Sequence, residues 1–452
     1  MKILITFFLS LNLYAGISQA PPSFTYRNTK AVFIDFIKTH YEMSYHVSNN
    51  QADATSTIEF FMPEDGMPLF DSLSSPTSIL IDGEEATSSL INSPQKITKL
   101  RVINKNIKRG YHSLKIQTLI EEGTKYNNER QNWGHVSSGF FIRDLKDRQF
   151  LEQYLPTNLE YDQYAMTMDV KVLGTKRYHS LFANGKVEKI SENHFFVEMP
   201  RFYTTSSVYF HLVPIHKYVR WYLTYPSIDG RDVPITIYSQ YRFYNKYVKE
   251  KAWRVLAELE ADYGPYPHDQ LIIYGTGIRG GMEHAGATET SIVSLGHELQ
   301  HMYFAKGIHP ANGNTGWLDE AIASWRDKGH QTLEKPFYES VNLANHNVYT
   351  RKTDKKSYEY GRSFMAYLDY TLKDIGKPGL KNFLKLYFDK RKFTTITTED
   401  FMHDLEDYAQ MSFDEDFNQY IYGLNKVYEV ETKYEENPHH PERTKEEMDS
   451  II

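Results

Sequence analysis

Residues 291–320 read SIVSLGHELQHMYFAKGIHPANGNTGWLDE, and they carry the strongest chemical signal in the chain. His297 and His301 lie four residues apart, and Glu298 directly follows the first of them. On an α-helix this spacing puts both imidazoles on one face, one turn apart, where a single zinc ion can accept both. Glu298 is rotated by about 100° from His297. Its carboxylate therefore lies beside the metal and can take a proton from a water molecule there.

The alternative is an ordinary half-exposed helix with two histidines on its polar side. However, SIVSL before the motif and MYF after it are apolar, which predicts a buried helix. Two histidines and a glutamate in a buried helix are costly unless something satisfies them. The context therefore favours a metal site.

Glu320 is the candidate for the third ligand that a catalytic zinc site needs besides an open position. Residues 302–319 separate it from His301. The segment TGWLDEAIASW predicts a second helix with Thr315 as its cap and an apolar stripe of Trp317, Leu318, Ala321, Ile322 and Trp325. The connecting AKGIHPANGNTG is rich in Gly, Asn and Pro, which is typical of a loop that returns one helix to the other.

Composition sets the broad class. A chain of 452 residues suits two or three domains, and 40% hydrophobic and 24% charged residues are typical of a folded soluble protein. The net charge of −7 provides no basic face for nucleic acid. The 35 tyrosines indicate half-exposed β-strands, with a wall of aromatic subsites as the other interpretation. Since the chain has no cysteine, it uses neither disulfides nor thiol chemistry.

The first 20 residues, MKILITFFLSLNLYAGISQA, are typical of a secretory signal peptide: an early lysine, a short apolar run and then small residues. Cleavage after Ala20 fits the small-residue rule. Because Pro21 follows at once, cleavage near Ala15 is the alternative. We predict an exported bacterial protein, periplasmic or secreted, with no stable membrane insertion after the signal is removed.

The pattern of the chain changes near residue 240. Residues 21–240 contain short, partly alternating apolar runs between turn residues, which predicts an antiparallel β-rich domain. Residues 241–423 predict a mainly helical domain, beginning with YNKYVKEKAWRVLAELEADYG and interrupted by the short strand LIIYG. Residues 424–452 are charged with few apolar anchors, which predicts a loose tail.

Three motifs together resemble the gluzincin zinc aminopeptidases of the aminopeptidase N family. The first is H-E-x-x-H with its downstream W-L-x-E helix. The second is GGMEH at 280–284, which is similar to the family's G-x-M-E-N motif. The third is SYEYG at 357–361, which is similar to the family's segment with the catalytic tyrosine. The likeness spans about residues 28–423. It implies an α+β multidomain fold: an N-terminal antiparallel β saddle-like domain followed by a thermolysin-like, mainly helical zinc metallopeptidase domain.

By this resemblance His297, His301 and Glu320 would hold one Zn2+ ion. Glu298 would be the general base that activates water, and Tyr358 would donate a hydrogen bond to the tetrahedral oxyanion.

The same resemblance assigns the substrate-binding segment. Glu283 would bind the free α-ammonium group of a peptide, and the backbone of Gly280 and Gly281 would lie along that peptide as an edge strand. Met282 and His284 complete the segment, His284 with a structural or substrate-lining role.

This sequence departs from the family pattern in four ways. His284 replaces the asparagine of the motif, which makes GGMEH similar to the segment in glycyl aminopeptidases. Asp319 stands where the family usually has asparagine, and Glu283 lies closer to His297 than expected. The sequence ends soon after Gly423, without the large C-terminal helical domain of the family, so we expect a more open cleft.

The leading hypothesis is an exported zinc aminopeptidase that acts on peptides with a free N-terminus. A zinc endopeptidase or glycyl-type aminopeptidase with the same centre is the second, and a catalytically retired fold used for binding is the third. The presence of all three ligands, the base and the tyrosine speaks against the third. Zinc itself is inferred from ligand type, because several divalent ions suit this set.

Overall fold

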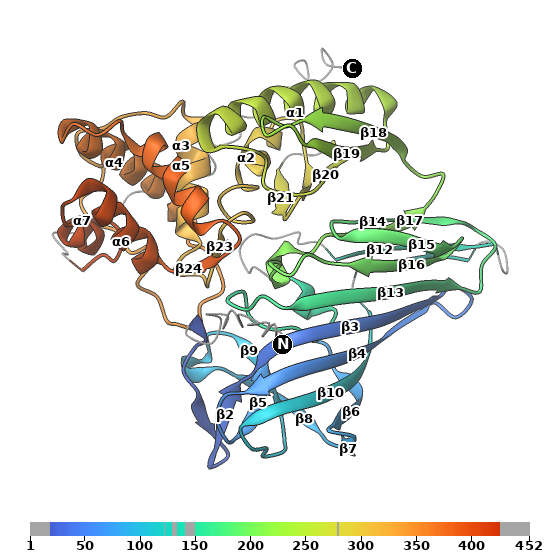
Figure 1. Ribbon diagram of the computed structural model, residues 1–452. Coiled ribbons are helices and arrows are strands. Elements are labelled where there is room, and N and C mark those ends of the chain that lie inside the picture. The colour runs from blue at the N-terminus through green and yellow to red at the C-terminus, as the bar shows by residue number, and fades with distance from the viewer. Residues whose placement is uncertain (1–18, 122, 129–132, 141–149, 278–279, 425–452) are drawn as a thin grey trace, which may run out of the picture.

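The structure is a computed structural model that describes residues 19–424 except 122, 129–132, 141–149 and 278–279 (Figure 1). A strand-rich region is followed by a mainly helical one, as the sequence predicts in outline. We call residues 19–218 the β region and residues 219–424 the helical region. Almost all of the predicted signal peptide and nearly the whole predicted tail lie outside the described residues.

The centre of the β region is an eight-stranded sheet. Its strands, in spatial order, are β15 (Lys186–Ser191), β16 (His194–Glu198), β13 (Ala165–Leu173), β3 (Asp35–His46), β4 (Gln51–Met62), β10 (Gly110–Leu119), β6 (Pro76–Ile81) and β7 (Glu84–Glu85). Burial alternates along β4, as the alternating sequence pattern predicts. The sheet is not wholly antiparallel, because β3 and β13 pair in parallel. This pair joins segments far apart in the sequence, a pairing that local patterns do not reveal.

Two smaller sheets complete the β region. One contains β1 (Phe24–Tyr26), β2 (Thr29–Phe33), β5 (Met67–Phe70), β9 (Lys99–Ile103) and β8 (Ser88–Asn92). The other contains β11 (Thr124–Asn127), β12 (His135–Phe140), β17 (Phe210–Pro214) and β14 (His179–Ala183). Short 3-10 turns lie at η2 (Pro94–Lys96), η3 (Leu151–Gln153) and η4 (Thr205–Ser207). A shared core packs residues of the eight-stranded sheet against residues of the four-stranded one, among them Phe60, Met168 and Phe210.

The helical region begins with a five-stranded sheet of β18 (Val219–Pro226), β19 (Asp232–Ser239), β20 (Leu271–Gly275), β22 (Ala287–Thr290) and β21 (Gly281–His284). Strands β18 and β19 precede residue 240, yet β19 pairs directly with β20. This sheet therefore begins before the domain boundary that the sequence pattern indicates, because a boundary set by periodicity cannot show which sheet a strand joins.

Seven α-helices follow or cover this sheet in the described residues (Figure 1). They are α1 (Arg242–Tyr263), α2 (Leu295–Gln300), α3 (Trp317–Asp327), α4 (Arg362–Asp374), α5 (Leu380–Arg391), α6 (Thr398–Ala409) and α7 (Asp414–Tyr420). A π-helical turn, η5 (Ser357–Gly361), leads into α4, and β23 (His309–Pro310) pairs with β24 (Thr395–Ile396). A capping box of Thr397 and Asp400 begins α6.

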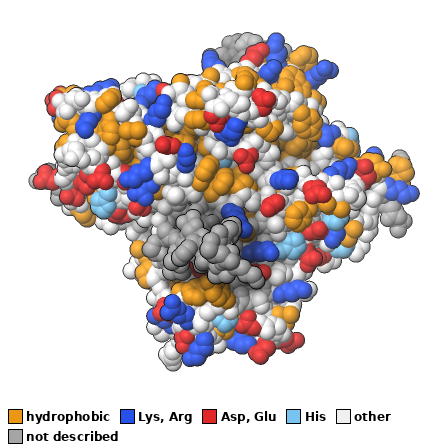
Figure 2. Space-filling model, in the orientation of Figure 1, with side chains coloured by type: hydrophobic (Ala, Val, Ile, Leu, Met, Phe, Trp, Pro, Cys, Tyr) orange, Lys and Arg blue, Asp and Glu red, His pale blue; other side chains and the backbone are white. Residues whose placement is uncertain are grey.

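The helices pack around one apolar core that contains Leu299 of α2, Trp317 of α3 and Phe364 of α4. None of the helices among the described residues is long and apolar enough to cross a membrane. On the face shown in Figure 2, basic and acidic side chains are interspersed.

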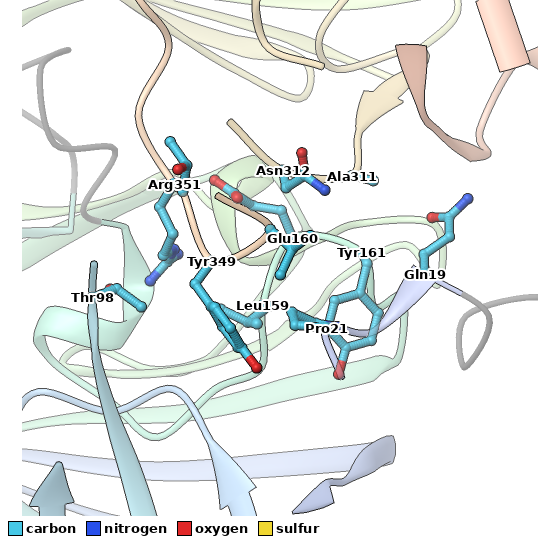
Figure 3. A pocket seen from close by; sticks show the side chains of 12 residues that line it. Gln19, Pro21, Thr98, Leu159, Glu160, Tyr161, Ala311, Asn312, Tyr349 and Arg351 are labelled. Atoms are coloured by element: carbon cyan, nitrogen blue, oxygen red, sulfur yellow. The ribbon is translucent and has the colours of Figure 1, made fainter. Parts of the chain in front are cut away.

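A buried ion cluster joins the two regions. Arg351, in the loop before η5, pairs with Asp71 after β5 and with Glu152 of η3, whose Oε1 lies 2.9 Å from the guanidinium Nη1. Both carboxylate side chains are 0% exposed. Burial raises the pKa of Asp71 well above its usual value, and the nearby arginine opposes this shift. Next to the cluster, a small pocket is lined by residues of both regions, including Leu159, Glu160, Asn312 and Tyr349 (Figure 3).

Replacing Arg351 with methionine should destabilise the protein. The change leaves two buried carboxylates without their counterion, so we expect the free energy of unfolding to fall by about 3–5 kcal/mol. Urea denaturation measures this difference. The exposed neighbour Lys352, changed to methionine, is the matched control and should alter stability by less than about 0.5 kcal/mol. Equal unfolding curves for both variants would contradict a stabilising role for the cluster.

Candidate active site

Helix α2 places both histidines of the H-E-x-x-H motif, although it is shorter than the sequence predicts. The helix covers only Leu295–Gln300, and His301 is its C-cap. Leu295 and Leu299 are fully buried, in agreement with the expectation of a buried helix. The apolar residues after His301 are also buried, but they lie in turns. The chain leaves the helix as soon as the second histidine is in place.

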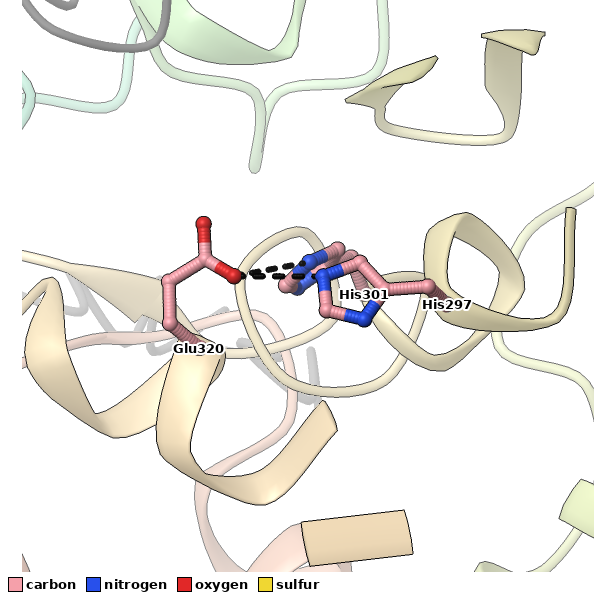
Figure 4. Close-up of side chains that lie close together, drawn as sticks. All are labelled: His297, His301 and Glu320. Atoms are coloured by element: carbon pink, nitrogen blue, oxygen red, sulfur yellow. Dashed lines mark hydrogen bonds and ion pairs between the residues drawn. The ribbon is translucent and has the colours of Figure 1, made fainter. Parts of the chain in front are cut away.

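Glu320, in the first turn of α3, faces these two imidazoles (Figure 4). Its Oε2 atom lies 3.2 Å from Nε2 of His297 and 3.6 Å from Nε2 of His301. Ligand atoms of all three residues lie within 4.8 Å of one another, so the group could hold one metal ion. Two imidazole nitrogens and one carboxylate oxygen are the donor set of a catalytic zinc site with an open position. The donors fit zinc in both chemistry and spacing.

Asp327 orients the first histidine, although none of the sequence motifs includes it. Its Oδ2 atom accepts a hydrogen bond of 2.8 Å from Nδ1 of His297, which leaves Nε2 directed at Glu320. A carboxylate behind a metal-binding histidine fixes the ring and raises its basicity. The sequence does contain a signal for this residue. Asp327 follows Glu320 by seven positions, and residues seven apart share one face of a helix. His301 has a weaker equivalent in the carbonyl of Phe304, 3.3 Å from its Nδ1.

Charge pairing dominates the electrostatics of this group. Burial lowers the pKa of His297, but hydrogen bonds to Asp327 and Glu320 raise it further, so the net pKa is well above the usual value. Burial raises the pKa of Glu320, but the hydrogen bond with His297 and the charges of His301 and His297 together outweigh it, so the net pKa is lowered. The carboxylate of Glu320 is thus stabilised in the ionised form, which is the form that binds a metal.

Glu298 is only 4% exposed and lies against the edge strand β21. A Cβ atom added to Gly281 would lie 2.5 Å from Oε1 of Glu298, so glycine is needed for this close approach. Burial raises the pKa of Glu298 well above its usual value; the imidazole of His297 lowers it, while Glu283 raises it. Ligand atoms of Glu298, Glu283 and His301 lie within 4.8 Å of one another. These three residues form a second group that could hold a metal ion, and Glu298 lies outside the trio of His297, His301 and Glu320.

Tyr358 lies in the π-helical turn η5, a rare backbone form that often occurs at functional sites. Its hydroxyl donates a 2.7 Å hydrogen bond to Oε1 of Glu320, and its ring stacks on His297 at an interplanar angle of 13°. Gly361 permits this position, because a Cβ there would lie 2.7 Å from Cβ of Ala321 on α3. The turn that holds the tyrosine therefore packs directly on the helix that holds Glu320.

Strand β21 carries the predicted substrate-binding segment and lies at the edge of its sheet. Gly280 has a φ of +87°, which favours glycine, and open space surrounds the position of its missing Cβ. Met282 and Glu283 are buried. His284 points to the β region instead: its Nδ1 lies 2.9 Å from the carbonyl oxygen of Val208. Burial and the charge of Lys306 lower the pKa of His284 to about 3, so this ring is neutral.

Comparisons with known proteins agree on the fold. The sequence matches no protein-family model and no curated protein. Yeast leukotriene A4 hydrolase gives a TM-score of 0.62 at 15% sequence identity, and the match covers 88% of this chain and 69% of that one. An M1 zinc metallopeptidase mutant from Deinococcus radiodurans, bound to a Tyr-Ser-Ala substrate, gives a TM-score of 0.60 at 15% sequence identity. This match covers 87% of this chain and 95% of that one. Aminopeptidase A of Legionella pneumophila, in complex with aspartic acid, gives a TM-score of 0.64 at 13% sequence identity. This match covers 86% of this chain and 49% of that one.

The chain therefore has the fold of the M1 zinc metallopeptidases and leukotriene A4 hydrolase. The resemblance predicted from the three motifs is confirmed at the level of the fold.

Replacing Asp327 with asparagine should weaken zinc binding by about 10–100-fold, because His297 loses its anionic partner. A competitive chelator titration measures the affinity. Asp374, an exposed aspartate at the end of α4, provides the matched control when changed to asparagine. Unchanged zinc affinity in the Asp327 variant would show that the carboxylate does not support a metal ligand.

Proposed function

We propose that this protein is a zinc-dependent aminopeptidase, exported from a bacterial cell, that removes N-terminal residues from peptides. The observation that carries the proposal is the convergence of His297, His301 and Glu320 within 4.8 Å, with Glu298 and Tyr358 beside them. The proposal includes a saddle-like N-terminal β domain and a thermolysin-like catalytic domain. The pairing of β19 with β20 supports a boundary between them near residue 218 rather than 240.

A zinc ion held by the three ligands would polarise the scissile carbonyl group and lower the pKa of a bound water molecule. Glu298 then has the role of general base: it accepts the proton of the attacking water and passes it to the leaving amine. Its position against β21 and His301, outside the ligand trio, supports this role. Asp327 keeps the ring of His297 in the orientation that directs Nε2 to the ion.

Tyr358 would stabilise the oxyanion of the tetrahedral intermediate by donating a hydrogen bond. In the structure its hydroxyl donates to Oε1 of Glu320, so the donor already lies at the ligand cluster. Burial, followed by the charge of Glu320, raises its pKa well above the usual value, which keeps the hydroxyl protonated and able to donate.

Glu283 would bind the α-ammonium group of the substrate. It is 4% exposed and lies on the edge strand β21, along which Gly280 and Gly281 would hold the peptide backbone. The carboxylate of Glu283 lies within 4.8 Å of the ligand atoms of Glu298 and His301. An ammonium group bound there would set how far the free N-terminus lies from the scissile bond. This arrangement favours removal of single residues.

Changing Glu298 to glutamine should lower kcat by about 10²–10⁴-fold while zinc remains bound, because the general base is lost. Hydrolysis of aminoacyl p-nitroanilides and metal analysis of the same samples test this. The exposed Glu250 of α1, changed to glutamine, is the control and should leave both values unchanged. Full activity in the Glu298 variant would exclude the proposed mechanism.

Changing Tyr358 to phenylalanine should lower kcat by about 10²–10³-fold with little change in KM, since the lost hydrogen bond forms only in the transition state. Steady-state kinetics with the same substrates separates the two constants. The exposed Tyr222 of β18 is the matched control for a change of tyrosine to phenylalanine. A change in KM alone would place Tyr358 in substrate binding instead.

A further inference from the structure

Lys306 is a fully buried cation to which the proposed mechanism gives no role. It lies in the turn after α2, and its side chain is 0% exposed. The ammonium group donates a 3.0 Å hydrogen bond to the backbone oxygen of Ser206 and a 3.3 Å hydrogen bond to its Oγ. The ring of Phe150 lies 5.4 Å from the same nitrogen. Both partners belong to the β region, so two segments of that region hold the charge in place.

The backbone is strained where it positions this lysine. Ala305, directly before Lys306, has a φ of +129°, a value that a residue with a side chain rarely adopts. Such strain persists only where the surrounding structure enforces it, and it gathers at functional sites. Lys306 therefore takes its position because its contacts demand it and not because the local backbone prefers it.

The charge of Lys306 lies at the carboxylate proposed to bind the substrate. Its Nζ atom is 3.8 Å from Oε1 of Glu283, and the Glu283 side chain is 6% exposed. A ligand atom of that same carboxylate lies within 4.8 Å of Glu298 and His301. Glu283 thus neighbours both a fixed internal cation and a histidine of the candidate metal group.

We infer that Lys306 is a specificity-determining residue that weakens the preference of this site for a free α-ammonium group, so that N-acylated peptides are hydrolysed as well. The inference rests on the proposed function. An arriving ammonium group would be a second cation at Glu283, and buried like charges repel strongly because the surroundings screen them little. A neutral, acylated N-terminus meets no such repulsion. The lysine is fixed, since its hydrogen bonds to the backbone oxygen and Oγ of Ser206 hold the ammonium group in place.

The test compares free aminoacyl p-nitroanilides with their N-acetylated counterparts in the wild type and in Lys306→Met. We expect the ratio of kcat/KM, free over acetylated, to rise at least threefold in this variant, through a lower KM for the free-amine substrates with little change in kcat. Lys306→Arg keeps the charge and should retain the wild-type ratio. A rise of less than threefold in the methionine variant, at normal zinc content, would overturn the inference.

Inhibitor binding to the wild type provides a second test that needs no variant. L-leucine hydroxamate and its counterpart without the amino group differ only in the α-ammonium. We expect the amino group to improve the inhibition constant by less than tenfold, and an improvement of tenfold or more would overturn the inference. Wild-type protein that binds zinc but cleaves no substrate would instead contradict the proposed function, and the inference with it.

Discussion

The site depends on ionisable groups that are buried against one another where α2, α3 and β21 meet. His297 and Glu320 are hydrogen-bonded there, with Glu298 and Glu283 on the adjacent side. Burying this many carboxylates is unfavourable unless cations compensate them. The chain supplies Lys306 and, without a metal, the protonated His297. A divalent ion would replace the proton of His297 and supply two positive charges. Much of the local structure follows from the need to keep these groups close and fixed.

The helical core meets this need by fixing short elements at close range. Leu299 anchors α2 and Trp317 anchors α3 in one apolar core, so the two helices present His297 and Glu320 to each other. Gly281 and Gly361 then allow a strand and a π-turn to approach more closely than any side chain would permit. The β region contributes as well, since Ser206 holds the buried Lys306 beside Glu283. The site is therefore built by both regions of the chain.

The sequence predicts the general fold and the central residues because their signals are local. Between His297 and Glu320 the sequence itself shows two histidines at helical spacing, a turn-rich loop and then a second helix with a glutamate. Long-range features are not readable in this way. The parallel pairing of β3 with β13, the assignment of β19 to the second sheet and the contact of Lys306 with Ser206 all join distant segments. The role of Asp327 could have been predicted, since this residue follows Glu320 by two helical turns on the same helix. The short length of α2 could not have been predicted, because apolar residues continue after the helix ends.

The central claim is that one metal ion binds between α2 and α3. Anomalous diffraction from crystals grown with zinc, collected on both sides of the zinc absorption edge, tests it most directly. We predict a single strong peak about 2.0–2.2 Å from Nε2 of His297, Nε2 of His301 and a carboxylate oxygen of Glu320. A fully loaded protein with no peak at this position, or with the ion bound elsewhere, would contradict the account.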